Sequence, residues 1–213
     1  MDFRYIALEG LPGSGKTALA ERLAARLDAT AVLEDADNPF LPDFFSERSG
    51  AAFQAQLFFL LNRHRQQVAL RQADLFAQVT ICDYLFERDK IYAYLNLDDN
   101  ELFIYQKLYD LLASDIAAPD IVVYLQAPVE VLLRRLRGRS RQQDGPPLPD
   151  ATFLQKLNEA YQHFFFHYSA TPLLIVEASC HDFEQSDEAV DDLLRQVRTM
   201  GGGTRYYVSR ALP

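Results

Sequence analysis

Cysteine is scarce in this chain of 213 residues, which has only Cys82 and Cys180 and no C-x-x-C pair. A disulfide framework needs several cysteines and a structural zinc site needs closely spaced thiols, so the sequence argues against both. We expect the two cysteines to be core thiols.

Positive charge is also in short supply, because 21 lysines and arginines face 30 aspartates and glutamates, for a formal net charge of −9. This balance argues against nucleic acid or an anionic membrane as the main partner. A small polyanion can still be held locally.

Long hydrophobic runs are missing as well. The run "LFFLL" is far shorter than a membrane span, and the first residues lack the basic-then-apolar pattern of a signal peptide. We therefore expect a cytoplasmic protein with no membrane partner. Its length suits one α/β domain with a full core.

Glycine is also infrequent, with nine residues in the chain, and three of them lie in "EGLPGSGKT" at residues 9–17, which fits the phosphate-loop pattern G-x-x-x-x-G-K-[ST]. An apolar run, "FRYIALE", precedes the motif as a strand would, and "KTALAERLAARL" follows it with leucines at helical spacing. The order strand, loop, helix is the context that this motif requires.

Each residue type in the motif suits the binding of a triphosphate such as ATP. The glycines let successive backbone N–H groups approach one anionic group at a helix N-terminus. Lys16 supplies a point charge for the β- and γ-phosphates, and the Thr17 hydroxyl is placed to bind Mg²⁺. The predicted nucleotide-binding residues are Gly10, Gly13, Ser14, Gly15, Lys16 and Thr17.

Four further apolar runs alternate with helical patterns, which predicts a mainly parallel, five-stranded sheet flanked by helices. The expected strands after the first cover residues 30–34, 78–83, 120–126 and 172–178. Ligands bind at the carboxyl ends of such strands, so we expect the phosphate loop, Glu34 and Asp83 at one rim.

The helices are expected at residues 50–73, 85–96, 99–116, 128–139, 150–168 and 186–199. Asp98 and Ser186 stand at acid-rich helix starts.

Two segments break the alternation. An arginine-rich stretch, "RRLRGRSRQQDGPPLPD" at residues 134–150, predicts a mobile lid at about 138–150, although a solvated helix end is the alternative. Residues 201–213 begin with three glycines and predict a flexible joint and a short tail.

As an ensemble, the motifs resemble the deoxynucleoside kinases, in particular the bacterial deoxyadenosine/deoxyguanosine kinase branch. The markers are "GLPGSGKT", "EDADNPFLPDFF", "FQAQLFFLLNRHRQQ", "CDYLFERDKIYA" and "LRRLRGR". The resemblance runs to about residue 177 and implies a P-loop kinase three-layer sandwich with an arginine-rich lid, spanning residues 1–200. It also implies ATP and Mg²⁺.

Glu34 resembles the general base of this family, which would accept the proton of the attacking sugar hydroxyl. Asp35 is the fallback, and the alternative is that both acids only cap the end of a strand. Asp83 lies where the family has an acid near the metal and the 5′ position of the sugar.

Gln56 resembles the glutamine that reads the base, because its amide offers both a donor and an acceptor. Arg63 and Asp89 resemble the pair that works with it, and they favour bases with an exocyclic amine such as adenine or cytosine. The alternative is an ion pair that only joins two helices. Phe53 and Phe86 are candidates for stacking on the base.

Lid arginines stabilise the charge of a transferring phosphoryl group. The resemblance suggests Arg135, Arg137 and Arg139 for this role, with Arg88 and Lys90 as nearby candidates of lower weight.

The chain departs from the family where the sugar 3′-hydroxyl is held. It has Phe44 and Phe45 where the family usually has Phe-Tyr, and Gln142 where the lid usually has a glutamate. Asp144 is a candidate substitute. His163 and His167 have metal-like spacing, but phenylalanines fill the space between them, so we expect a packed or capping pair.

The residues and the resemblance together therefore predict a deoxynucleoside kinase that uses ATP to make a 5′-monophosphate for salvage. The resemblance also implies a homodimer packed through helices. One alternative is a nucleoside monophosphate kinase of the thymidylate kinase type, which should carry Asp-Arg-Tyr where this chain has "CDYLF". Another is a catalytically weak ATP-binding module with a sensing or scaffolding role.

Overall fold

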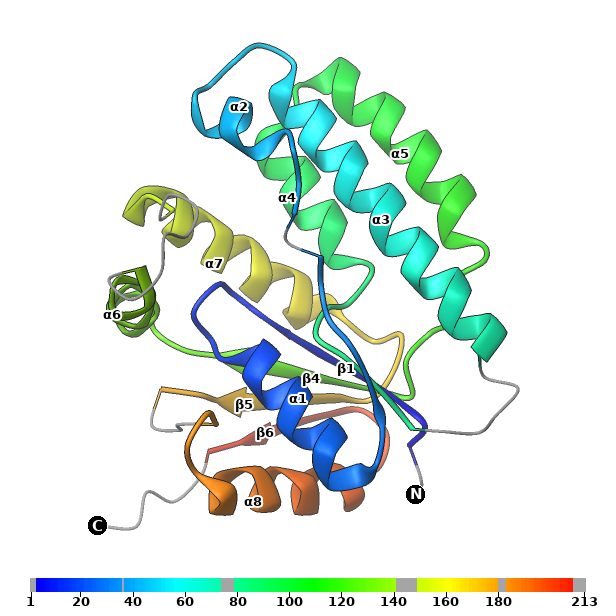
Figure 1. Cartoon of the computed structure of the whole chain (residues 1–213), viewed down its shortest axis with the longest axis vertical. Helices are drawn as coiled ribbons and strands as arrows, with labels where there is room; N and C mark the ends of the chain where they lie inside the picture. The colour runs from blue at the N-terminus through cyan, green and yellow to red at the C-terminus, as the bar shows by residue number, and fades with distance from the viewer. Residues whose placement is uncertain (1–2, 36, 74–78, 141–148, 180–182, 209–213) are drawn as a thin grey trace. The chain divides into compact units, whose positions relative to one another are not determined.

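The computed structural model in Figure 1 describes residues 3–35, 37–73, 79–140, 149–179 and 183–208. The chain divides into two compact units. The first unit comprises Met1–Leu33, Gln78–Leu85 and Pro119–Pro213, and the second comprises Glu34–Ala77 and Phe86–Ala118. The single domain expected over residues 1–200 stays a prediction.

A parallel sheet forms the centre of the first unit, with the strand order β2-β3-β1-β4-β5-β6. Its strands are β1 (Tyr5–Gly10), β2 (Thr30–Val32), β3 (Thr80–Cys82), β4 (Ile121–Gln126), β5 (Leu173–Glu177) and β6 (Thr204–Tyr207). The sequence predicted the first five and missed β6, so the expected count of five is corrected to six. Edge strand β6 is short and half-exposed and lacks an apolar run, so its sequence does not show the pattern of a buried strand.

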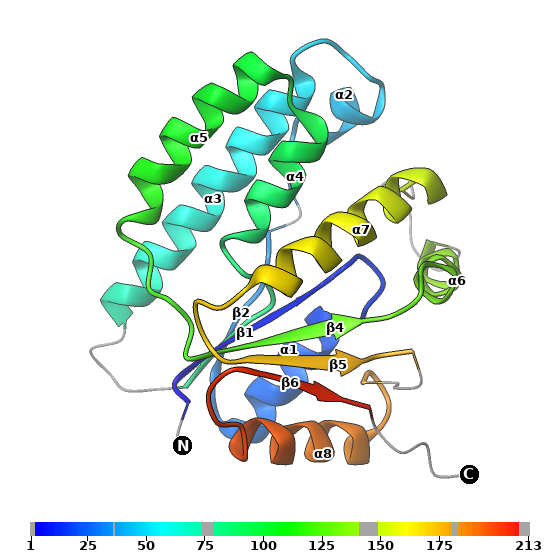
Figure 2. The same ribbon diagram turned by 180° about the vertical axis from the view of Figure 1, so that it is seen from behind.

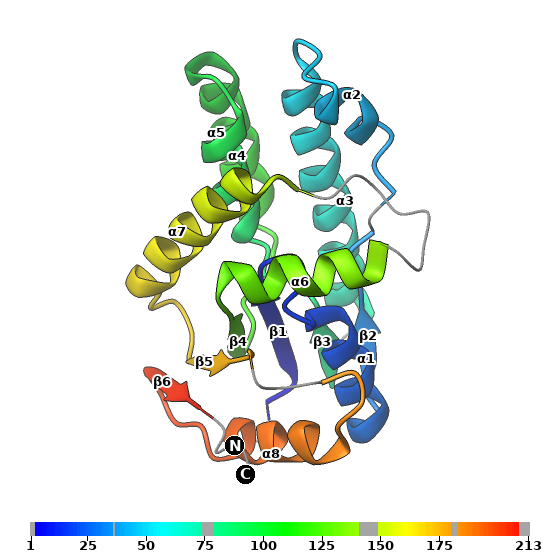
Figure 3. The same ribbon diagram turned by 90° about the vertical axis from the view of Figure 1, so that its left-hand side faces the viewer.

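Helices cover both faces of this sheet, which explains why β4 is buried from Ile121 to Leu125. Helices α1 (Lys16–Leu27) and α8 (Asp187–Arg198) lie on one face, and α7 (Ala151–His167) lies on the other (Figures 1 and 2). Figure 3 shows α6 (Val129–Ser140) next to α7.

Aromatic stacking joins α7 to the sheet. The ring of Phe165 stacks on the ring of Tyr124 with centroids 4.0 Å apart, and the Tyr161 ring packs beside both. Because these side chains come from one helix and the middle of the sheet, they fix α7 against β4.

Helix α8 begins where the sequence predicted. The Ser186 hydroxyl accepts a hydrogen bond from the Ala189 N–H at 3.1 Å, which is an N-cap. Arg22 of α1 donates to the Phe183 carbonyl at 2.7 Å and pairs with Asp187, so the start of α8 is anchored on α1.

The second unit is helical, with α2 (Leu41–Phe45), α3 (Ala51–Ala73), α4 (Arg88–Asn96) and α5 (Asp99–Ala113). Helices α3, α4 and α5 lie side by side (Figure 2). Their common core contains Leu60, Phe86, Ala93, Tyr105 and Tyr109.

A capping box starts α5, since the Asp98 carboxylate accepts from the Asn100 and Glu101 N–H groups while Glu101 accepts from the Asp98 N–H. This confirms the predicted start at Asp98. The other predicted helices are present with slightly different ends, whereas α2 was missed because five residues are too few to show a helical period.

Within the described ranges, no helix combines the length and the apolar character needed to cross a membrane.

Close packing at Gly10 gives a test of the fold. A Cβ at this position would lie 2.7 Å from both the Leu125 carbonyl oxygen and the Ser14 hydroxyl. Since one contact is backbone, we expect Gly10→Ala to lower the free energy of unfolding by about 1–3 kcal/mol, measured by urea denaturation. Gly138→Ala in α6 is the control: its Cβ meets nothing within 4 Å, so stability should stay equal or rise. Equal stabilities for the two variants would contradict this packing.

Candidate functional site

The phosphate loop runs from the end of β1 to the first residues of α1. Gly13 and Gly15 have φ angles of 84° and 93°, a left-handed conformation that side chains disfavour. Gly15 is the N-cap of α1, so the amides of the first helical turn begin directly after the loop. Lys16 and Thr17 are the first residues of that helix. This arrangement suits a phosphate group at the helix N-terminus.

Helix α6 packs against this loop. A Cβ on Gly13 would lie 3.0 Å from the Leu132 carbonyl oxygen and 3.1 Å from Cγ of Leu136. The loop therefore contacts the helix that leads into the predicted lid.

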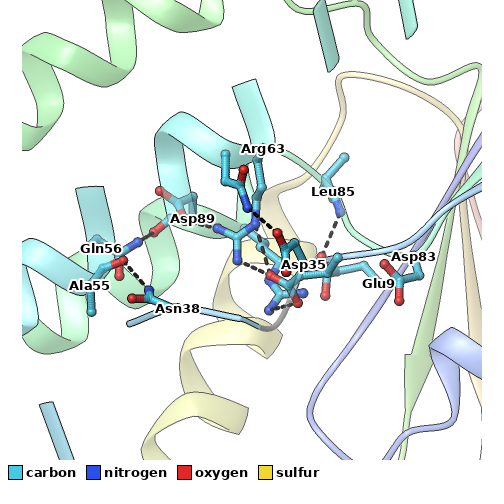
Figure 4. A network of polar contacts seen from close by, with 12 residues as sticks. Glu9, Asp35, Asn38, Ala55, Gln56, Arg63, Asp83, Leu85 and Asp89 are labelled. Carbon is cyan, nitrogen blue, oxygen red and sulfur yellow. Dashed lines mark hydrogen bonds and ion pairs between the residues drawn. The ribbon is translucent and has the colours of Figure 1, made fainter. Parts of the chain in front are cut away.

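A buried carboxylate that the sequence analysis did not single out supports the loop. Glu9 accepts hydrogen bonds from the Gly10 N–H at 2.8 Å and the Leu85 N–H at 2.9 Å, and the Tyr161 hydroxyl donates to it at 3.2 Å (Figure 4). It is fully buried. Its signal in the sequence is a single acid at the end of an apolar strand.

Thr17 and Asp83, the two predicted metal ligands, lie together. The Thr17 hydroxyl donates to Asp83 Oδ2 at 2.7 Å. Asp83 follows β3, which pairs in parallel with β1, so both side chains come from the carboxyl ends of neighbouring strands. A hydroxyl and a carboxylate are oxygen donors of the kind that Mg²⁺ prefers, so this pair fits that ion. Among the described residues, no group of three His, Cys, Asp or Glu side chains forms a metal site.

Glu34, the predicted proton acceptor, belongs to the second unit, where two arginines contact its carboxylate. Arg63 Nε donates to Glu34 Oε1 at 3.1 Å, and Arg63 Nη2 bonds to the same oxygen. Arg88 Nη2 lies 3.0 Å from Glu34 Oε2. These contacts hold Glu34 at the start of the loop that precedes α2.

Arg63 also pairs with Asp89, the other acid that the sequence predicted for it (Figure 4). Asp89 is fully buried, and the Tyr105 hydroxyl donates to its Oδ2 at 2.7 Å. Burial raises the pKa of the Asp89 carboxyl, while Arg63 and Tyr105 act in the opposite direction. Burial opposes the charged form of Arg63, but Glu34 and Asp89 raise its pKa above the usual value, so Arg63 stays charged.

Gln56 is fixed by the same group of residues. Its Nε2 donates to the Asp89 backbone carbonyl at 3.0 Å, which leaves Oε1 of the amide as an acceptor. In the neighbouring position, the Ala55 carbonyl accepts from Asn38 Nδ2 at 2.9 Å, so the turn after Glu34 is tied to α3.

Asp35, the fallback base, faces a different partner. Asn62 Nδ2 donates to its carboxylate at 3.0 Å, and this hydrogen bond, together with one from the Asp37 N–H, holds the pKa of Asp35 below its usual value. Asp35 is exposed.

The predicted stacking residues lie in or beside the core. Phe86 is buried with its ring 5.3 Å from the Tyr109 ring, and Phe53 packs against the same cluster. Phe44 and Phe45, the departures near the expected sugar site, lie in α2 and contact each other. Their roles toward a nucleoside stay predictions.

The lid arginines differ in their surroundings. Arg135 Nη2 donates to the carbonyls of Ala178 at 2.8 Å and Ser179 at 3.2 Å, whereas Arg137 is exposed. The side chain of Arg139 and the lid residues 141–148, with Gln142 and Asp144, lie outside the described residues. Lys90 lies over the Tyr109 ring at 4.1 Å.

The remaining predicted features have structural partners. The His167 ring nitrogen Nδ1 lies 2.9 Å from the His163 carbonyl, and the two rings are 4.6 Å apart, which agrees with a packed pair. Cys82 is buried in β3, and burial raises the pKa of its thiol to about 12. Cys180 lies outside the described residues.

Comparisons with known proteins show which family the chain is similar to. The family model described as "Deoxynucleoside kinase" matches residues 6–200. A deoxyguanosine kinase of Bacillus subtilis (strain 168) is 34% identical over 139 residues, which are 64% of this chain and 67% of that protein. A deoxyadenosine kinase of Dictyostelium discoideum is 32% identical over 166 residues, 75% of this chain and 66% of that protein. The chain thus spans about two thirds of each relative.

A solved structure shares the fold. It is a deoxyadenosine kinase from M. mycoides with the products dCMP and a flexible dCDP bound, and it matches with a TM-score of 0.74 at 21% identity, covering 92% of this chain and 99% of that chain. Since the family model spans nearly the whole chain, and a relative above 30% identity is matched over two thirds of its length, the chain belongs to the deoxynucleoside kinase family.

Proposed function

We propose that this chain transfers the γ-phosphate of ATP to the 5′-hydroxyl of a deoxynucleoside, giving a deoxynucleoside 5′-monophosphate and ADP. The observation that carries the proposal is the position of Arg63, which bonds to Glu34 with one edge and to Asp89 with another. One side chain thereby contacts the proposed proton acceptor and the acid whose backbone carbonyl orients Gln56, the proposed base reader. Membership of the family supports the same reaction.

The phosphate loop would hold ATP in the first unit. Its glycines permit close approach of backbone N–H groups, and Lys16 supplies positive charge to the β- and γ-phosphates. Thr17 and Asp83 would hold Mg²⁺, which neutralises charge on these phosphates when bound.

Glu34 would accept the proton of the 5′-hydroxyl while the oxygen attacks the γ-phosphorus. The bond from the 5′ oxygen to phosphorus forms, the bond from that phosphorus to the β-γ bridging oxygen breaks, and ADP leaves with the electron pair. Arg137 and Arg139 are our candidates to stabilise the charge on the transferring group. Arg135 is a weaker candidate, since it already donates to two carbonyls.

Gln56 would read the nucleobase. Its Nε2 is engaged by the Asp89 carbonyl, so Oε1 can accept from a base that presents an exocyclic amine, such as adenine or cytosine. The relatives are a deoxyguanosine and a deoxyadenosine kinase by name, which supports a deoxynucleoside as the acceptor. A cytoplasmic salvage role completes the proposal.

Loss of the proton acceptor tests the reaction. We expect Glu34→Gln to lower kcat by about 10²–10⁴-fold while ATP still binds, because the amide cannot take up the proton. The measurement is a steady-state screen with ATP and Mg²⁺ against the four deoxynucleosides, their ribose counterparts and thymidine monophosphate.

Glu47→Gln, a change of the same kind at an exposed position after α2, is the control and should leave kcat unchanged. Preferred turnover of thymidine monophosphate would favour a nucleoside monophosphate kinase instead. Binding of ATP without turnover of any acceptor would favour a sensing module.

Loss of the base reader should act on nucleoside binding. We expect Gln56→Leu to raise KM for the preferred deoxynucleoside by about 10-fold or more and to leave KM for ATP unchanged, because a hydrogen bond to the base is lost. Gln54→Leu on the exposed side of the same helix is the matched control. Parallel rises in both KM values would speak against a role in base reading.

We further propose that a second copy of the chain covers an apolar surface on α5. This α5 surface consists of Phe103, Ile104, Leu108 and Leu111, with exposed fractions of 61%, 49%, 38% and 70%. The residues recur at helical spacing, so they form one stripe, and contiguous apolar surface of this kind marks an interface. The resemblance to the deoxynucleoside kinases, which implies a homodimer packed through helices, supports a second copy as the occupant.

Charge on the α5 surface should abolish this pairing. We expect the double change Phe103→Glu and Leu111→Glu to convert a dimer into a folded monomer in analytical ultracentrifugation, because buried carboxylates at an apolar interface are costly. Tyr206→Glu, on exposed strand β6, should leave the dimer intact. A wild-type chain that sediments as a monomer would exclude the homodimer.

A further inference from the structure

The Glu34 carboxylate is contacted through both of its oxygens, by arginines from two different helices. Arg63 of α3 directs both Nε and Nη2 to Oε1, and Arg88, the first residue of α4, directs Nη2 to Oε2 at 3.0 Å. The Arg88 side chain is 7% exposed, so it is committed to this buried cluster.

Each arginine head is also held by an aromatic ring of its own helix. The Arg88 guanidinium lies over the Tyr92 ring at 5.3 Å, and the Arg63 guanidinium lies over the Phe59 ring at 5.1 Å. In both helices the ring is four residues from the arginine, on the same face. Cation–π contact therefore restricts where each guanidinium can point.

Hydrogen bonds to only one oxygen do not fix the orientation of a carboxylate group. The last torsion of a glutamate side chain is broad, so a group held only at Oε1 can still swing about that oxygen. Arg63 bonds to Oε1 through Nε and Nη2, and Arg88 adds a contact at Oε2, which restrains the plane of the group.

The charges of this cluster also favour a role for Arg88 at Glu34. Arg63 is shared between Glu34 and Asp89, whereas the Arg88 ion pair is with Glu34. The two arginines repel each other, since Arg88 acts to lower the pKa of Arg63. A buried second guanidinium is therefore unfavourable in this cluster unless it neutralises Glu34.

We propose that Arg88 is a positioning residue for phosphoryl transfer, which holds Glu34 in one orientation and in its ionised form until the carboxylate accepts the proton. This inference rests on the proposed function. It gives Arg88 a role through Glu34 and not through contact with phosphate.

The test compares Arg88→Gln and Arg88→Lys with wild type in kcat, in KM for the deoxynucleoside and in the pH profile of kcat. We expect Arg88→Gln to lower kcat by about 10–100-fold with little change in KM, because orientation is lost but not substrate contact. Arg88→Lys keeps the charge and should recover part of kcat. Arg195→Gln, which removes an exposed ion-paired arginine of α8, is the control for lost charge.

The pH profile separates positioning from simple structural support. The charged groups around Glu34 are Arg63 from α3, Arg88 from α4 and Asp35 next in the chain, with Asp89 beyond Arg63. Removing the positive charge of Arg88 disfavours ionised Glu34, so the acid limb of kcat should move to higher pH in Arg88→Gln and return in Arg88→Lys.

If Arg88→Gln fails to fold, Tyr92→Leu tests the positioning role instead, because this variant keeps the charge of Arg88 and removes the ring under its guanidinium. A several-fold lower kcat with unchanged KM supports the inference, whereas unchanged kcat overturns it. A folded Arg88→Gln with wild-type kcat and pH profile, or with a raised KM alone, also overturns it. A wild-type chain without turnover of any deoxynucleoside would instead overturn the proposed function.

Discussion

The guanidinium of Arg63 is the constraint on which the polar interior of the second unit depends. It comes from the middle of α3 and binds one acid that precedes this helix and another that follows it in the chain, Glu34 and Asp89. Three separate segments are thereby joined by one planar group whose fork geometry suits carboxylates. The hydroxyl of Tyr105 satisfies a remaining oxygen of Asp89, and α5 is thus part of the same network. Because every charge in it has a partner, the network can remain buried.

Glu9 has a comparable place in the first unit, with a different chemistry. Its neighbours are neutral donors, two backbone N–H groups and the Tyr161 hydroxyl, instead of opposite charges. A buried acid satisfied in this way ties the entry of the phosphate loop to the residues that follow Asp83. Buried acids therefore hold chain segments together in both units, by ion pairs in the second unit and by neutral donors in the first.

Periodic features were predictable from the sequence, and features set by tertiary contact were not. The strands up to β5 and the helices from α3 onward could be predicted because each is long or apolar enough to show its period, and Thr17 could be matched to Asp83 because parallel strands deliver both to one edge. Strand β6 could not be predicted because an edge strand needs no apolar run. The contact between the Arg88 guanidinium and Glu34 could not be predicted either, because spacing along α4 does not show it. The orientation of Gln56 likewise depends on a backbone carbonyl that no motif records.

The position of β1 also has a consequence for synthesis of the chain. This strand is made before the other strands of the sheet, but it lies in the interior of the sheet, and its partners β3 and β4 are made much later, with Gly10 aligned to Leu125. Contacts so distant in sequence form slowly and only once both segments are available. On the ribosome, the phosphate loop therefore has no finished scaffold until β4 has emerged. A nascent chain that ends before this strand carries the complete nucleotide motif without the sheet that gives the motif its shape.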